Sequence, residues 1–153
     1  MENDGRVARL AVAGLAVALL AGCGGQGDPT RTPAGAAQVR FLEDLYNGRV
    51  DRAYATLHPA FQRIVPRARF VECTRRVALG GLDSIEVLEV YEDPVDVPGS
   101  GRVGAKAVRV RLTSTSGDAT TFVNHEVKVG PRWRWVLNDA AARAYRAGRC
   151  PAG

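Results

Sequence analysis

The apolar residues of this chain change their spacing once, near Ser84, and this change limits the folds that the chain can adopt. Before it, apolar residues recur every three to four positions, as on a helix that buries one face. After it, they alternate with polar residues, which is typical of strands that bury one face of a sheet. Because the strands are consecutive and joined by short turns, the pattern predicts an α+β fold, with N-terminal helices packed on a curved antiparallel sheet.

Three helices are expected in the first half of the chain, and residues with known preferences mark their ends. The first helix ends at Gly48, and the second begins at Asp51, a favourable N-cap residue. The second ends at His58, because the residue before a proline avoids helical backbone angles. Gly80 and Gly81 end the third helix. The apolar positions of the three helices are Val39, Leu42, Leu45 and Tyr46, then Ala53, Tyr54 and Leu57, then Phe70, Cys73 and Val77.

Four strands are expected after the change of spacing. The first strand switches its apolar face between Val87 and Leu88, which indicates a β-bulge. A loop rich in turn-forming residues, 93–104, follows it, and a short C-terminal helix capped by Asn138 or Asp139 ends the domain. The positions expected to face the core are Val108, Val110 and Leu112 in the second strand, Thr121, Val123, His125, Val127 and Val129 in the third, and Trp133, Trp135 and Leu137 in the fourth.

An apolar run precedes these elements and contains a cysteine near its end. The run Leu10–Gly25 has no charged or strongly polar side chain. It is short and rich in small residues, whereas a stable membrane span takes about 20 predominantly apolar residues. Its length and position suit the apolar part of a secretory signal peptide. The end of the run, Leu20-Ala21-Gly22-Cys23, resembles the lipobox of bacterial lipoproteins.

The resemblance to lipoproteins implies that Cys23 receives a diacylglycerol and that residues 1–22 are removed as a signal peptide. Two or more acyl chains give a stable anchor, at about 0.8 kcal/mol per buried CH₂. A plain signal peptide and an uncleaved anchor are the alternatives. Glu2 and Asp4 do not suit the basic start of a signal peptide, and they favour translation from a later start near Val7.

The remaining chain is expected to form one domain on a tether. Residues 23–36 are mostly Gly, Pro, Thr and Ala, which predicts a flexible tether behind the lipidated cysteine. Residues 37–153 are enough for a single α+β domain with a core, and too few for two.

The charge of the chain is basic and almost entirely carried by arginine, with a formal net charge of +5. Anionic lipid headgroups or wall polymers would attract such a surface, at about 1 kcal/mol for each nearby basic residue. An ordinary solvated surface is the alternative, and nucleic acid is not expected as a partner outside the membrane. The arginines around the third helix are Arg63, Arg67, Arg69, Arg75 and Arg76.

Two cysteines remain once Cys23 is lipidated. In an exported protein, where disulfides persist, Cys73 and Cys150 are expected to pair. The chain-entropy model gives a stabilisation of about 4.5 kcal/mol for so long a loop. Two free thiols are the alternative.

The order of elements resembles a known superfamily. The chain has helices that include His58-Pro59, and then curved strands that end in Gly130-Pro131-Arg132-Trp133. This order is similar to that of the cone-shaped α+β domains of nuclear transport factor two and ketosteroid isomerase. With the lipobox, Phe70-Val71-Glu72-Cys73 and the stretch from Trp135 to Cys150 look like small lipoproteins of actinobacteria with that fold. The resemblance implies a pocket between sheet and helices, used by some members for catalysis and by others for binding.

Four residues are the candidates for this pocket: Tyr54, His125, Trp133 and Trp135. An inward His125 could act as an acid or base near neutral pH, and the alternative is a core histidine with one hydrogen bond. The tryptophans could stack on a ligand or simply fill the core. His58 is expected to cap helix carbonyls.

No catalytic residue is assigned from the sequence. The isomerase-like enzymes need a pocket carboxylate or a His/Asp pair, and four carboxylates are expected at outward or turn positions: Glu86, Glu89, Asp118 and Glu126. The two histidines are far apart and no metal-ligand cluster is evident, so neither a metal nor another cofactor is expected.

The sequence therefore predicts a non-enzymatic lipoprotein on the outer face of the cell membrane, which it contacts through the lipid on Cys23. Its partner is expected to be a small ligand or an envelope protein. A pocket enzyme of the isomerase or dehydratase kind, with His125 and Tyr54 as acid and base, is the main alternative, and a purely structural envelope protein is the other.

Overall fold

The computed structural model describes residues 27–75 and 81–152. The signal peptide, Cys23 and the expected helix positions Val77 and Gly80 lie outside these residues. The elements are, in chain order, η1 (Pro29–Arg31), α1 (Pro33–Tyr46), α2 (Val50–Ala55), α3 (Pro59–Gln62), α4 (Arg67–Thr74), β1 (Leu82–Glu92), β2 (Val95–Val97), β3 (Gly101–Val103), β4 (Lys106–Ser114), β5 (Ala119–Val129), β6 (Arg132–Val136) and α5 (Asp139–Arg146).

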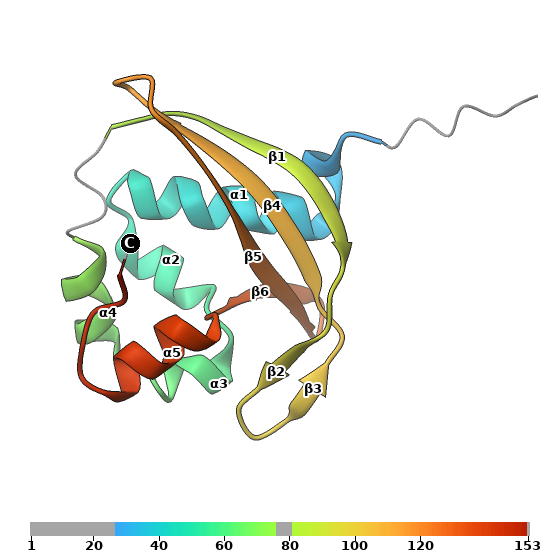
Figure 1. Cartoon of the computed structure of the whole chain (residues 1–153). Coiled ribbons are helices and arrows are strands. Elements are labelled where there is room, and N and C mark those ends of the chain that lie inside the picture. Colours follow the sequence, from blue (N-terminus) through green and yellow to red (C-terminus); the bar gives the residue numbers. More distant parts are fainter. Residues whose placement is uncertain (1–26, 76–80, 153) are drawn as a thin grey trace, which may run out of the picture.

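Four strands form one curved antiparallel sheet in the order β1-β4-β5-β6, and the helices lie on its concave side (Figure 1). Helix α1 crosses this side and contacts all four strands. This arrangement is the predicted α+β fold, with helices first, a curved sheet and a short C-terminal helix. The segment 93–104, which the sequence predicts as a loop, instead contains the separate hairpin of β2 and β3.

Helix α1 begins earlier than predicted, inside the stretch 23–36 that the sequence assigns to a tether. Thr32 is the N-cap, and its Oγ1 accepts a hydrogen bond from the N–H of Gly35 at 3.1 Å. Pro33 occupies the first helical position, where its missing N–H is tolerated. Ala34 is only 2% exposed, so the first turn already packs in the core. In residues 29–36, Pro, Thr and Gly therefore mark a capped helix start rather than a linker.

The second predicted helix corresponds to α2, and a further short helix, α3, begins at Pro59, where the sequence predicts no helix. The predicted N-cap, Asp51, lies in the first turn of α2, and the cap position belongs to Arg49. A carboxylate in the first turn still favours the helix because it faces the positive end of the helix dipole. Helix α2 ends at Ala55, and the N–H of its C-cap residue Thr56 donates to the carbonyl of Ala53 at 3.1 Å.

His58 caps the start of α3 rather than the carbonyls at the end of α2. Its Nδ1 accepts a hydrogen bond from the N–H of Ala60 at 3.1 Å. Burial, and then the charges of Arg63 and Arg134, lowers the pKa of His58. The lowered pKa favours the neutral ring, which is the form that can accept this bond.

The sheet confirms most of the predicted inward positions. Val108 and Val110 of β4 are fully buried and Leu112 is nearly so. The register of β1 against β4 shifts between Val87 and Glu89, as expected for the predicted bulge.

Strand β5 turns towards the helices the face opposite to the one predicted, although Val127, also predicted as a core position, is buried at 5% exposure. Phe122 and Asn124 lie opposite the buried Val110 and Val108 of β4, so the even-numbered residues of β5 face the helices. Consequently Glu126 is buried and His125 lies on the outer face, whereas the sequence predicts the reverse. The side of β5 with more valines is the outer side, and Val123 on it is 36% exposed.

The core is centred on an aromatic cluster between the helices and β6. The ring of Trp135 stacks on Phe41 of α1 at a centroid distance of 4.4 Å and lies 5.9 Å from Phe70 of α4. The open edge of β6 is partly closed by the segment after α2. There the N–H of His58 donates to the carbonyl of Trp135 at 2.9 Å, and Leu57 forms a parallel bridge with the same residue.

The cysteines paired in the sequence prediction join α4 to the segment that follows α5. The Sγ atoms of Cys73 and Cys150 lie 2.10 Å apart, as in a disulfide, and Cys73 is buried. Across the described ranges, 27–75 and 81–152, no helix is both long enough and apolar enough to cross a membrane.

Candidate functional site

The structure separates the four predicted pocket residues rather than bringing them into one pocket. Tyr54 lies in the helical layer, where its ring packs 5.5 Å from that of Phe70. Its hydroxyl donates a hydrogen bond to the carbonyl of Val65 at 2.8 Å, and burial raises its pKa. Tyr54 therefore ties two helical segments together and presents no free hydroxyl to a ligand.

The two tryptophans have different environments, although both face the concave side of the sheet. Trp135 is buried, and its indole N–H donates to the carbonyl of Ala53 at 3.3 Å. Trp133, nearer the start of β6, is only half-buried and lines a surface cleft. Trp135 is thus a core residue, and Trp133 is accessible to a ligand.

His125 lies on the outer face of the sheet and pairs with a carboxylate. Its Nε2 is 2.7 Å from Oδ2 of Asp93, which follows β1 directly. Both residues line a small cleft of about 260 Å³ with Val95 of the β2–β3 hairpin and Val136 of β6. A His/Asp pair, which the sequence analysis does not find, is therefore present, but on the convex side.

The cleft that contains Trp133 lies between the start of α1, the end of α2 and the start of β6, and we call it the Trp133 cleft. Its volume is about 480 Å³. Figure 1 shows that the first turn of α1 and the start of β6 lie at the same end of the domain. The residues that line it are Pro33, Ala36, Arg40, Thr56, Pro131, Arg132, Trp133 and Arg134.

The Trp133 cleft is strongly basic. Arg40, Arg132 and Arg134 line it, and no carboxylate does. None of the three forms an ion pair with another described residue, although Arg134 donates a hydrogen bond to the carbonyl of Ala55. The N-terminal end of α1 adds the positive end of a helix dipole. Such a cleft attracts an anion, and the indole provides an apolar surface beside it.

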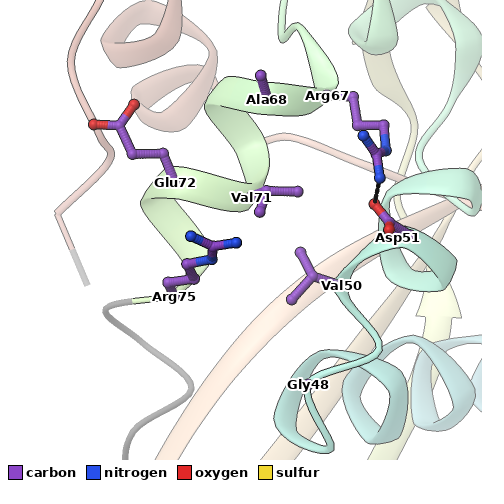
Figure 2. A pocket seen from close by; sticks show the side chains of 8 residues that line it. All are labelled: Gly48, Val50, Asp51, Arg67, Ala68, Val71, Glu72 and Arg75. Atoms are coloured by element: carbon purple, nitrogen blue, oxygen red, sulfur yellow. Dashed lines mark ion pairs between the residues drawn. The ribbon is translucent and has the colours of Figure 1, made fainter.

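A larger groove of about 600 Å³ runs between α2 and α4, and Figure 2 shows its lining. Its charges are balanced, because Arg67 pairs with Asp51 at 2.6 Å across the groove. Glu72 likewise pairs with Arg69, at 2.7 Å. Two of the arginines around the third predicted helix, Arg67 and Arg69, are thus paired with carboxylates. This groove therefore attracts an anion less strongly than the Trp133 cleft does.

Two buried polar side chains lie on the facing surfaces of α1 and the sheet. Gln38 and Glu126 are 0% and 1% exposed. Neither the amide nor the carboxyl has a hydrogen-bond partner among the described residues. Burial raises the pKa of Glu126 to about 8, and the charge of Arg40 opposes this rise only in part. At neutral pH the carboxyl is therefore mostly protonated, which is the usual response of an acid without a buried partner.

The three arginines of the Trp133 cleft are not among the predicted site residues, although a local signal marks two of them. Arg132 and Arg134 flank Trp133 directly, and basic residues on both sides of an aromatic one indicate an anion site. Arg40 has no such signal, because it lies on α1, far away in the sequence.

The described parts of the chain contain no group of three or more His, Cys, Asp or Glu side chains that could hold a metal ion. Comparison of the chain with protein-family models, with curated proteins and with solved structures finds no match.

Proposed function

We propose that this protein is a lipid-anchored domain on the outer face of the cell membrane that binds an anionic ligand in the Trp133 cleft and catalyses no reaction. The observation that carries the proposal is the set of three arginines around a half-buried tryptophan with no carboxylate among the lining residues. The lipid on Cys23 and the membrane location are part of the proposal and rest on the resemblance to the lipobox.

We also propose that the fold is a variant of the nuclear transport factor two cone. The helices that precede a curved antiparallel sheet, and the helical layer on its concave side, support this. In this variant Phe41, Phe70 and Trp135 largely fill the inside of the cone. The ligand therefore binds in the Trp133 cleft, at the edge of the sheet beside β6.

The arrangement of the candidate acid and base favours binding over catalysis. Tyr54 belongs to the helical layer on the concave side, and His125 points to the convex side, so the sheet lies between them. Their separation leaves no common space for a substrate. Replacement of His125 by Ala should leave ligand binding unchanged, and a loss of binding would favour the enzyme alternative.

Fluorescence of Trp133 offers a direct test of the cleft. Titration of the mature protein with phenyl phosphate, which carries an anion on an aromatic ring, should change the tryptophan emission, and inorganic phosphate should bind more weakly. Trp133→Phe should remove the emission change. Arg132→Ala should weaken binding by about tenfold or more, since a charged hydrogen bond contributes about 1.5–3 kcal/mol.

The matched control for the loss of one charge is Arg143→Ala, because Arg143 is exposed on α5 and does not line the cleft. It should bind like the wild type. Equal weakening by Arg132→Ala and Arg143→Ala would mean that net charge alone attracts the probe, and the proposed site would then be wrong.

The anchor is tested by the intact mass of the protein extracted from membranes, measured before and after reduction. We expect residues 23–153 plus diacylglycerol, with a gain of two hydrogens on reduction of the disulfide. An uncleaved or unlipidated chain would overturn the membrane location.

A further inference from the structure

We propose that the anion recognised by the Trp133 cleft is the phosphate of the lipid headgroups in the bilayer that carries the protein, so that the domain lies with this cleft on the membrane. This inference rests on the proposed function and adds the chemical class of the ligand and the orientation of the domain.

The distance along the chain from the proposed anchor to the cleft is short. Pro33, which lines the cleft, comes ten positions after Cys23. The short helix η1 comes earlier still in the chain, and it packs against α1 and β1. Only six positions separate Cys23 from Pro29, and a fully extended chain covers about 20 Å over that length. A lipid on Cys23 therefore holds the start of α1 close to the headgroups.

The side chains of the cleft suit a phosphate at the surface of a bilayer. Guanidinium groups form paired hydrogen bonds to phosphate oxygens, and they do so while remaining charged. A tryptophan at the rim suits the same level of the bilayer, because indoles favour the boundary between headgroups and acyl chains. Trp133 lies between two arginines in sequence, and the exposed Lys128 is its partner in the register of β5 against β6.

The Trp133 cleft differs from two other surfaces of the domain that carry arginines. On the outer face of the sheet, Arg109 and Arg111 are paired with Glu89 and Glu86 at 3.3 and 3.2 Å. The groove between α2 and α4 also has its carboxylates. The arginines of the Trp133 cleft have no carboxylate partner among the described residues, and the cleft also lies at the anchored end.

The experiment uses the lipidated mature protein in vesicles that contain brominated phospholipid, which quenches a tryptophan close to the bilayer. One set of vesicles is phosphatidylcholine alone, and the other contains about one third phosphatidylglycerol. We expect stronger quenching of the tryptophan emission in the anionic vesicles. Trp133→Phe should lose most of this quenching. The double variant Arg132→Ala/Arg134→Ala should reduce it by at least half. High salt should weaken the quenching, because it screens the attraction between the arginines and the headgroups. Arg143→Ala should behave as the wild type.

The failure of this inference is distinguishable from the failure of the proposed function. If phenyl phosphate binds in the cleft but Trp133 is not quenched in either kind of vesicle, the cleft faces away from the bilayer. In that case the headgroup inference is wrong and the ligand is a free anion. If Trp133→Phe is quenched as strongly as the wild type, the domain meets the membrane with another surface, which also overturns the inference. If neither phenyl phosphate nor the vesicles affect Trp133, the binding site itself is wrong.

Discussion

His125 and Glu126 are neighbours on β5, yet they experience opposite environments because successive side chains of a strand point to opposite faces. On the outer face, His125 has a carboxylate partner 2.7 Å away and remains partly accessible. On the inner face, Glu126 is 1% exposed and has no hydrogen-bond partner among the described residues. Ionisable groups on the outer face are thus paired in water, whereas the acid on the inner face stays mostly neutral at neutral pH.

This comparison extends to the whole sheet. The outer face of β1 and β4 carries ion pairs between exposed side chains, which contribute about 0–1 kcal/mol each. The inner face carries the aromatic cluster and the buried aliphatic residues of β4. Substitutions should therefore change stability strongly on the inner face and weakly at the exposed positions of the outer face, which do not include the buried Val127 and Val136.

The largest expected effect comes from Glu126→Gln, and it depends on pH. In the folded protein the pKa of Glu126 is about 8, above its usual value of 4.5, so the folded state keeps a proton that the unfolded chain loses between these pH values. The wild type should lose stability as the pH rises through this range, by up to about 5 kcal/mol, with no effect below the unfolded pKa. Glu126→Gln should lack this loss and be the more stable protein at pH 8.

Urea unfolding at several pH values measures the difference. The control is Glu89→Gln on the outer face, which should follow the wild-type pH dependence. Parallel stability curves for Glu126→Gln and the wild type would show that Glu126 is ionised in the folded state.

Phe41→Ala should destabilise the protein at every pH. Its ring is buried and stacks on Trp135 at 4.4 Å, and removal of a buried phenylalanine ring costs about 3–5 kcal/mol. Val123→Ala is the control on the outer face, since Val123 is 36% exposed, and it should cost less than about 0.5 kcal/mol. Similar losses for the two variants would mean that the aromatic cluster is loosely packed.

Asp93→Asn should have a modest effect, because the side chains of His125 and Asp93 are 22% and 45% exposed. Loss of the charge should reduce the free energy of unfolding by about 1 kcal/mol or less. Urea unfolding measures it, with His125→Asn as the partner variant. A loss as large as that of Phe41→Ala would indicate that the cleft on the outer face is closed to water.

The smallest expected effect is the coupling between Glu89 and Arg109, whose charged atoms lie 3.3 Å apart. Both side chains are about half-exposed, so a double-mutant cycle with alanine should give about 0.5 kcal/mol or less. The coupling should vanish in high salt because the pair is screened. A coupling that persists in salt would show that the outer face is shielded from solvent.

Much of the fold follows from local patterns, and the exceptions have specific causes. The spacing of Val108, Val110 and Leu112 predicts their burial correctly, and the change of face after Val87 predicts the bulge. The capped start of α1 was missed because Pro, Thr and Gly occur both in linkers and at helix starts. The β2–β3 hairpin was missed because its strands have three residues each, too few for an alternating pattern.

The candidate site was less predictable than the fold. Arg40 and Arg132 lie on α1 and β6, and only the packing of α1 beside the start of β6 brings them into one cleft. Of the four predicted pocket residues, Trp133 alone lies in the proposed site. Arg132 and Arg134, which flank it in the sequence, indicate an anion site, but the prediction considered only the two tryptophans.

By itself, the sequence determined the order of the longer helices and strands, because apolar period, caps and turn residues act over a few positions, whereas α3 and the β2–β3 hairpin are too short to leave such a pattern. Only the tertiary structure decided which face of β5 turns towards the helices, since the odd-numbered face carries more apolar residues and the register against β4 nevertheless turns the even-numbered face inward. The same choice placed Glu126 inside and His125 outside. Neighbouring side chains of a strand point to opposite sides of the sheet. A difference of one residue in register therefore buries Glu126 and places His125 on the outer face, the reverse of the prediction.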